Sequence, residues 1–180
     1  ALGQVYMALG QRESALNACG FAQSLKPKDA AAKACMEEAQ RDVREAIARH
    51  CSQFPDEYWL ERDQSGVFPE EFYRSLADSG WLGIAMPEKF GGSGLGITEA
   101  AIMMQAIAES GAGMTGCSSV HINIFGLEPI VLFGTEEQKQ RYMPRLATGE
   151  LIAAFCLTEP GAGSDAAAVK TTAVRDGDHW

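Results

Sequence analysis

The sequence FCLTEPGAGSD occupies residues 155–165 and begins within an apolar run, residues 151–157, that predicts a buried strand. Pro160, Gly161 and Gly163 interrupt both helical and ladder hydrogen bonding, so the strand must give way to a loop. Glycines lack a Cβ, which lets a planar or phosphorylated ligand come close to the backbone N–H donors. The stretch therefore predicts a strand end followed by a ligand-binding loop.

Two hydroxyl groups lie in this loop. Thr158 and Ser164 can each donate and accept a hydrogen bond. Exposed amides beside two alcohols suit a polar cofactor, and we expect both hydroxyls to line a crevice between helices and the emerging sheet. The loop holds no acid–base pair, so proton chemistry must come from elsewhere. Glu159 is expected to fix the turn by accepting hydrogen bonds from backbone amides.

Composition limits the partners. The chain has 180 residues and a formal charge of −9, and nucleic-acid phosphates would be repelled by that charge. Its 46% hydrophobic and 22% charged residues are ordinary for a globular protein that buries a core. We expect no membrane span, because no apolar run approaches the ~20 residues that a membrane helix needs. No secretory signal is visible, although Ala1 is not taken as the native start.

Cysteine and histidine usage argues against a metal site. The five cysteines are odd in number and form no C-x-x-C pair, and each lies in an apolar or helical context, which favours reduced thiols in a cytosol-like compartment. The three histidines share no ligand spacing with them. No zinc site is expected.

The first 33 residues have a pattern of their own. Leu2, Gly3, Tyr6, Ala15, Ala22 and Pro27 fall where a tetratricopeptide repeat places its packing residues. One such unit cannot bury its apolar face alone, and no second repeat follows. The favoured interpretation of residues 1–33 is a tetratricopeptide-like helical hairpin from a peptide-binding array, and the alternative is an amphipathic hairpin that matches by chance.

Residues 34–150 predict a helical domain. Helices are expected over about 29–53, 69–79, 98–108, 117–133 and 135–149, with residues 54–67 and 86–96 as loops. Thr98 is the expected cap of the third helix, and Thr135 with Gln138 predicts a capping box. His121 and Asn123 interrupt an apolar helix and are expected to make buried hydrogen bonds.

Residues 151–180 predict the start of a β domain. The run 151–157 and the β-prone stretch 170–175 are expected strands, and Asp176-Gly177 is a hairpin turn signal. Two stretches match the dinucleotide fingerprint. Residues 111–116 follow a helix, and residues 161–166 leave no room for a crossover helix, so neither predicts a Rossmann unit.

The ungapped stretch 158–165, TEPGAGSD, resembles the first signature of the FAD-dependent acyl-CoA dehydrogenases. Residues 80–84, 86–88, 91–92 and 133–139 are also familiar from that family, and the resemblance covers roughly residues 41–180. It implies a mainly α fold: a helical N-terminal domain of the acyl-CoA dehydrogenase type, then the truncated start of an antiparallel β domain, preceded here by the helical hairpin.

The resemblance also implies a cofactor site. Leu157 and Thr158 would contact the pyrimidine side and N5 of FAD, Phe155 would lie along the ring edge where relatives often have tyrosine, and Ser164 would bond the pantetheine arm of acyl-CoA. Gly163 completes the expected cofactor-binding set by allowing close approach. No catalytic residue is expected in this chain, because the family's glutamate base belongs to a later domain.

The implied activity is flavin-dependent α,β-dehydrogenation of acyl-CoA thioesters, with this polypeptide supplying part of the site and inactive alone. Expected partners are the acyl-CoA substrate, an electron-transferring flavoprotein and, at full length, copies of the same chain. The implied compartment is the bacterial cytoplasm or the mitochondrial matrix. The alternative is a non-catalytic helical interaction scaffold with a peptide-binding repeat, and a third possibility is a mis-joined gene model.

Overall fold

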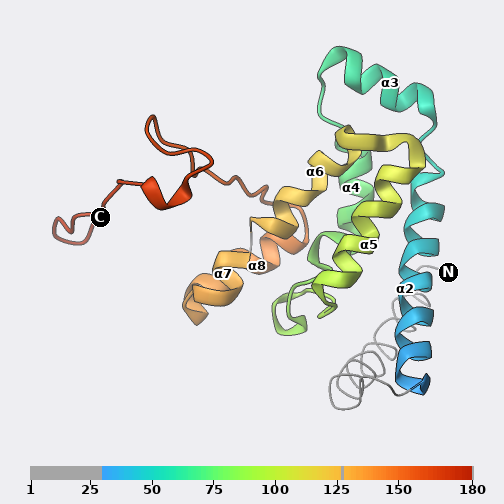
Figure 1. Ribbon diagram of the computed structural model, residues 1–180, viewed down its shortest axis with the longest axis horizontal. Coiled ribbons are helices and arrows are strands. Elements are labelled where there is room, and N and C mark those ends of the chain that lie inside the picture. Colours follow the sequence, from blue (N-terminus) through green and yellow to red (C-terminus); the bar gives the residue numbers. More distant parts are fainter. Residues whose placement is uncertain (1–29, 127, 180) are drawn as a thin grey trace.

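The structure is a computed structural model that describes residues 30–126 and 128–179. Its helices pack side by side into one body, from which the C-terminal segment extends away (Figure 1). The elements are α2 (Ala30–Cys51), α3 (Asp56–Ser65), α4 (Glu70–Asp78), η1 (Trp81–Gly83), η2 (Glu88–Phe90), α5 (Ile97–Ile107), η3 (Ala108–Ala112), α6 (Gly113–Phe125), α7 (Glu128–Phe133), α8 (Glu136–Ala147) and η4 (Ala166–Ala168). The expected hairpin at 1–33 lies outside the described residues, except for 30–33 in α2.

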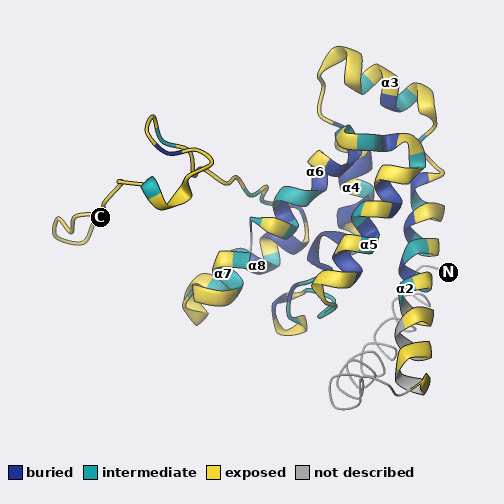
Figure 2. Cartoon of the chain, in the orientation of Figure 1, coloured by how far each residue is buried: buried dark blue, intermediate teal, exposed yellow. Residues whose placement is uncertain are grey.

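The core forms where α2 lies along α5 (Figure 2). Val43, Ile47 and Cys51 follow one another at four-residue steps, so they share one face of α2. All three are buried, as are Met103 and Ile107 on the facing side of α5. These residues give α2 one buried face over its second half.

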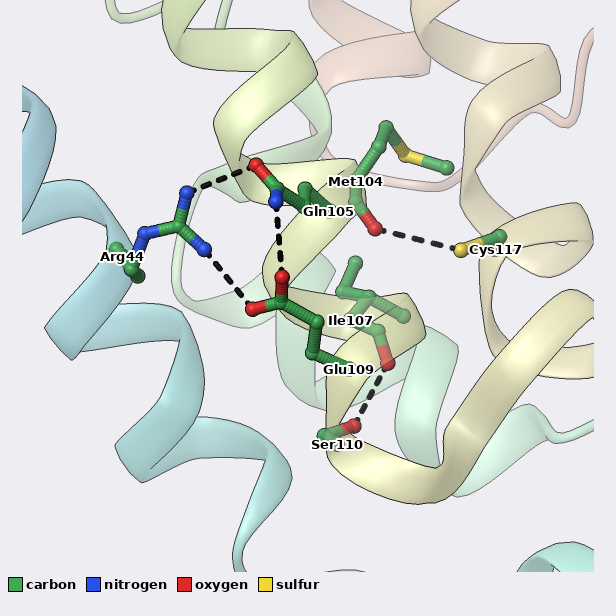
Figure 3. Close-up of polar contacts among 7 residues, drawn as sticks. All are labelled: Arg44, Met104, Gln105, Ile107, Glu109, Ser110 and Cys117. Carbon is green, nitrogen blue, oxygen red and sulfur yellow. Dashed lines mark hydrogen bonds and ion pairs between the residues drawn. The ribbon is translucent and has the colours of Figure 1, made fainter.

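A polar contact ties the same two helices together at the surface. The guanidinium of Arg44 donates to Gln105 Oε1 at 2.8 Å and to Glu109 Oε2 at 2.9 Å (Figure 3). Exposed ion pairs of this kind contribute about 0.2–1 kcal/mol to the free energy of unfolding. Their main effect here is therefore on the rotation of α2 relative to α5, and they add little to stability.

The passage from α5 to α6 is a π-helical turn, η3. Gly111 lies in the left-handed region with φ 92°, and a Cβ there would come within 2.7 Å of Asp56 Oδ1. Ser110 Oγ donates to Ile107 O, and Cys117 Sγ donates to Met104 O across the bend (Figure 3). Glycine suits this turn because other residues rarely adopt this φ, and a side chain here would also displace the Asp56 carboxylate.

Residues 54–67 are not the expected loop, because α3 occupies most of them. The signals that start and stop this helix are present in the sequence: Pro55 precedes it, Asp56 and Glu57 face the positive end of its dipole, and Gly66 follows with φ 68°. The many charged residues between Pro55 and Gly66 had instead indicated a loop. Trp59, 4% exposed, is the residue by which α3 packs into the core.

Other helix ends agree with the sequence in part. The Thr135 capping box is confirmed, with Gln138 N donating to Thr135 Oγ1 and Thr135 N donating to Gln138 Oε1. The cap of α5 is Gly96 rather than Thr98, because the carboxylate of Glu99 accepts from the Gly96 N–H. The expected helix 117–133 is divided into α6 and α7, and Pro129 lies in the first turn of α7, where its missing N–H is tolerated.

No strand occurs among the described residues, so the expected strands at 151–157 and 170–175 are wrong for this chain. A strand needs a neighbour to bind its backbone groups, and the described chain offers none there. Only two isolated bridges occur in the described part, Glu159 with Ala162 and Asp176 with His179. The second confirms the expected turn at Asp176-Gly177, where Gly177 has φ 62°.

By length and composition alone, the stretch Ile97–Phe133 is long and apolar enough to cross a membrane. The sequence had predicted no such stretch. It is not one straight helix in the described residues. The chain turns at η3, and α6 and α7 are separate elements. The first part, α5, lies against α2, and 24% of the apolar window is buried within the described residues.

Phe72 is a test of this core. Its ring is fully buried, 4.8 Å from the Trp59 ring and 5.2 Å from the Phe54 ring between centroids. We expect Phe72→Ala to lower the free energy of unfolding by about 3–5 kcal/mol, measured by urea denaturation. The matched control is Phe133→Ala, whose side chain is 84% exposed and which should change stability by less than about 0.5 kcal/mol. Equal losses in the two variants would contradict this description of the core.

Candidate functional site

One buried side chain of α6 hydrogen-bonds the segment that leads into the predicted loop. Asn123 of α6 is 1% exposed, and its Oδ1 accepts from Ala153 N at 2.9 Å. Its Nδ2 donates to Leu151 O at 3.2 Å and to Tyr73 Oη at 2.8 Å, with Leu146 O at 3.3 Å. The expectation that Asn123 makes buried hydrogen bonds is confirmed, but its partners were not predictable.

Side chains of this segment alternate between the helices and solvent. Ala153 packs on Gly126, where an added Cβ would lie 3.1 Å from Ala153 Cβ. The Phe155 ring meets the Phe125 ring at 5.5 Å between centroids and an interplanar angle of 64°. Ile152, which precedes Ala153, is 55% exposed, and Ala154, which lies between Ala153 and Phe155, is also exposed. Residues 151–155 thus keep the two-residue period of a strand while docking on a helix.

The loop closes on itself at residues 159–162. Glu159 N donates to Ala162 O at 2.9 Å, and Ala162 N donates to Glu159 O at 3.1 Å. Pro160 and Gly161 form the corner between them, as turn residues do. Ala162 is only 4% exposed, so this small turn has an interior of its own.

The carboxylate of Glu159 holds the far end of the loop. Its Oε2 accepts from Lys170 N and its Oε1 accepts from Thr171 N, both at 2.9 Å. The pKa of Glu159 is held below its ordinary value by hydrogen bonds to its carboxylate. The largest effect comes from the Thr171 side chain, and the backbone amides of Lys170 and Thr171 add to it. We call this arrangement the Glu159 clasp, and it confirms the structural role expected for that residue.

The cofactor-binding residues expected from the sequence are all exposed. Phe155 and Leu157 are 46% and 45% exposed, and Thr158, Gly163 and Ser164 also face solvent. The expected crevice between helices and sheet is not formed by the described chain, because no sheet forms and the loop extends away from the helical body (Figure 1). The two hydroxyls therefore lie on an open surface.

The same residues are chemically suited to a planar, polar-edged group such as FAD. A Cβ added at Gly161 or Gly163 would meet no atom within 4 Å, so the backbone here is open to close approach. Within the described residues, neither Thr158 nor Ser164 makes a side-chain hydrogen bond to protein. The hydroxyl donors that a ring edge would need are free within the described residues, and the apolar side chains of Phe155 and Leu157 lie beside them in sequence.

A separate groove of about 350 Å³ lies between the α3–α4 connection and the start of α6. Val67, Phe68 and Met114 form its apolar side, and Thr115 and Ser118 its polar side. Its cation, Arg62, is engaged by Glu71 at 3.3 Å. No sequence pattern predicted this groove. The connection between α3 and α4, which lines it, lies away from the C-terminal segment that carries the loop (Figure 1).

No group of three or more potential metal ligands occurs among the described residues. The described cysteines, Cys51, Cys117 and Cys156, are free thiols. Burial raises the pKa of Cys51 and of Cys117, which keeps both protonated and unreactive.

Comparison with known proteins bears on the helical domain. The family model described as "Acyl-CoA dehydrogenase, N-terminal domain" matches residues 37–150. It gives no support to the tetratricopeptide-like repeat expected at residues 1–33. Since the matched range ends before the loop, it does not test the cofactor-binding residues.

Individual relatives extend the likeness to most of the chain. Bovine mitochondrial isovaleryl-CoA dehydrogenase is 38% identical over 160 residues, which cover 87% of this chain and 37% of that protein. Acryloyl-CoA reductase (NADH) of Anaerotignum propionicum is 46% identical over 117 residues, 64% of this chain and 29% of that protein. The chain thus spans well under two thirds of either relative's length.

A solved structure shares the fold. The acyl-CoA dehydrogenase of Bacillus anthracis complexed with FAD superposes with a TM-score of 0.58 and 35% identity, covering 74% of this chain and 23% of that chain. Identity above 30% with this overlap makes the similarity one of sequence as well as architecture.

The Glu159 clasp predicts an acid-sensitive loop. The folded-state pKa of Glu159 lies below the ordinary 4.5. The stabilisation of the loop by the ionised carboxylate is therefore complete above pH 4.5 and is lost as the pH falls through the folded-state pKa. Amide exchange followed by NMR should therefore show protection of Lys170 and Thr171 at neutral pH that disappears in acid.

Glu159→Gln should remove protection of one of these two amides at every pH, because an amide side chain has one acceptor oxygen. The control, Glu137→Gln, changes the same charge at an exposed position of α8 and should leave both amides protected. Unchanged protection in Glu159→Gln would show that the clasp does not hold the loop.

Proposed function

Because the chain belongs to the acyl-CoA dehydrogenase family, we propose that it supplies part of the FAD and acyl-CoA site of an enzyme that desaturates acyl-CoA thioesters between their α and β carbons. The observation that carries the proposal is the open loop 158–164, with two free hydroxyls and an uncovered glycine backbone, held out from a family-type helical domain. Acyl-CoA relatives and an FAD-bound homologue support the choice of ligands.

In this proposal each loop residue has a binding role. Thr158 donates its hydroxyl to the N5 side of the flavin, Leu157 contacts the pyrimidine side, and Phe155 lies along the ring edge. FAD, when bound, supplies the acceptor for the hydride that leaves the β carbon. Gly163 lets the ligand reach the backbone, and Ser164 bonds the pantetheine arm of the substrate.

The proton must be removed by a base from outside the described residues. Glu159 is the nearest carboxylate in sequence, but both of its oxygens accept backbone amides. Those bonds lower its pKa, which makes it a weak base. We therefore assign Glu159 to loop structure, and the family's glutamate base to a part of the enzyme outside this chain.

The proposed partners follow from the same family. They are an acyl-CoA substrate, an electron-transferring flavoprotein that reoxidises the cofactor, and further copies of the enzyme. The relative named acryloyl-CoA reductase (NADH) makes reduction of an enoyl thioester the second candidate reaction. Assays in both directions, with and without NADH, distinguish the two.

The first experiment concerns the 180-residue chain itself. We expect it to bind FAD more weakly than about 1 μM, because only one open side of the proposed site is present to offset the cost of association. Flavin fluorescence titration measures this directly. Sub-micromolar binding would show that the loop alone forms the cofactor site.

The second experiment concerns an enzyme of the relatives' length that carries this chain. Thr158→Val should slow flavin reduction in stopped flow by about ten- to a hundredfold, because one hydrogen bond to developing charge is lost. Its acyl-CoA affinity should change by less than about threefold. Thr158→Ser, which keeps the hydroxyl, is the rescue control, and equal reduction rates in Thr158→Val and the parent would remove Thr158 from the mechanism.

A further inference from the structure

The extended segment 151–155 is bound as if it had a neighbouring strand. In an extended chain the carbonyl of one residue and the N–H of the residue two further on point to the same edge. Asn123 bonds this pair of groups: its Nδ2 donates to Leu151 O and its Oδ1 accepts from Ala153 N. One side-chain amide thus takes the place of one residue of a pairing strand.

The register set by Asn123 extends as far as Phe155. With residues 151 and 153 fixed, Ala153 packs on Gly126 at the end of α6, and two residues later Phe155 reaches the Phe125 ring. A slip of one residue would turn Phe155 outward and Cys156 inward, and it would reverse the face that Thr158 presents. The hydrogen bonds of Asn123 therefore select one of two presentations of the loop.

We propose that Asn123 is the positioning residue of the loop 158–164, setting through Leu151 and Ala153 the face that Thr158 offers to the flavin. This rests on the proposed function, since it assigns the loop to FAD. Asn123 is 1% exposed, so it acts through the backbone that it binds.

Two test variants and two controls distinguish an effect on the register of residues 151–155 from an effect on the stability of the helical body. Asn123→Leu removes both segment bonds, and Ala153→Pro removes one of them from outside the helical body, so that variant should keep its fold. The matched control for the proline is Ile152→Pro, whose N–H has no hydrogen bond among the described residues. The control for the buried amide is Tyr73→Phe, which removes a helix-side partner and leaves the segment bonds.

Two measurements are made on these variants. In the 180-residue chain, the nuclear Overhauser contact between the Phe125 and Phe155 rings should disappear in Asn123→Leu and Ala153→Pro and persist in both controls. In an enzyme of the relatives' length, FAD affinity should fall about tenfold or more in the first pair, as the loss of one or two hydrogen bonds predicts. The control pair should bind within about threefold of the parent.

Each outcome decides the proposal. Loss of the ring contact with unchanged FAD affinity would overturn it, and so would a ring contact that persists in both test variants. An FAD affinity that falls equally in Tyr73→Phe would make Asn123 merely structural. If the parent enzyme itself bound no FAD, the proposed function would fail first, which is a different result from unequal binding among variants.

Discussion

The side chain of one buried residue, Asn123, hydrogen-bonds both the helical body and the segment that leads out of it. Asn123 lies on α6 and bonds Tyr73 of α4, the end of α8 through Leu146 O, and the outgoing segment at Leu151 and Ala153. Its removal would take a partner from the buried Tyr73 hydroxyl and from the part-buried Leu151 O and Ala153 N, and a buried polar group left without a partner costs about 1–3 kcal/mol. Buried polar networks of this kind specify one arrangement, because every alternative leaves a donor or acceptor unpaired.

The loop beyond it is shaped by separate contacts. The Glu159 clasp and the turn at residues 159–162 lie within the loop, and none of their partners belongs to the helices. The conformation of the loop is thus determined locally, while its placement is determined at Asn123. The two can change independently: acid releases the clasp without touching a neutral amide, and a substitution at Asn123 leaves the clasp intact.

The sequence predicted the local contacts of this structure and missed the non-local ones. The Thr135–Gln138 capping box, the turn at Asp176-Gly177 and the role of Glu159 involve partners within a few or a dozen residues, and all three were predicted. The partners of Asn123 lie 23 to 50 residues away, beyond the reach of any spacing rule. The prediction of a strand at 151–157 was wrong, because β-propensity measures how well a segment fits into a sheet. A sheet also requires a second strand to pair with. The helix α3 was missed although Pro55 and Gly66 mark both of its ends.

The exposure of the loop is consistent with a binding surface. Phe155 and Leu157 leave nearly half of their surface in water beside the free hydroxyls of Thr158 and Ser164. Apolar side chains in such a position lose the hydrophobic gain of burial, and nothing in the described chain covers them. A planar heterocycle with polar edges would cover the apolar side chains with its face and satisfy the hydroxyls with its edge. The helical body contributes the remaining requirement, because a surface of this size binds well only when its backbone is held in one register before the ligand arrives.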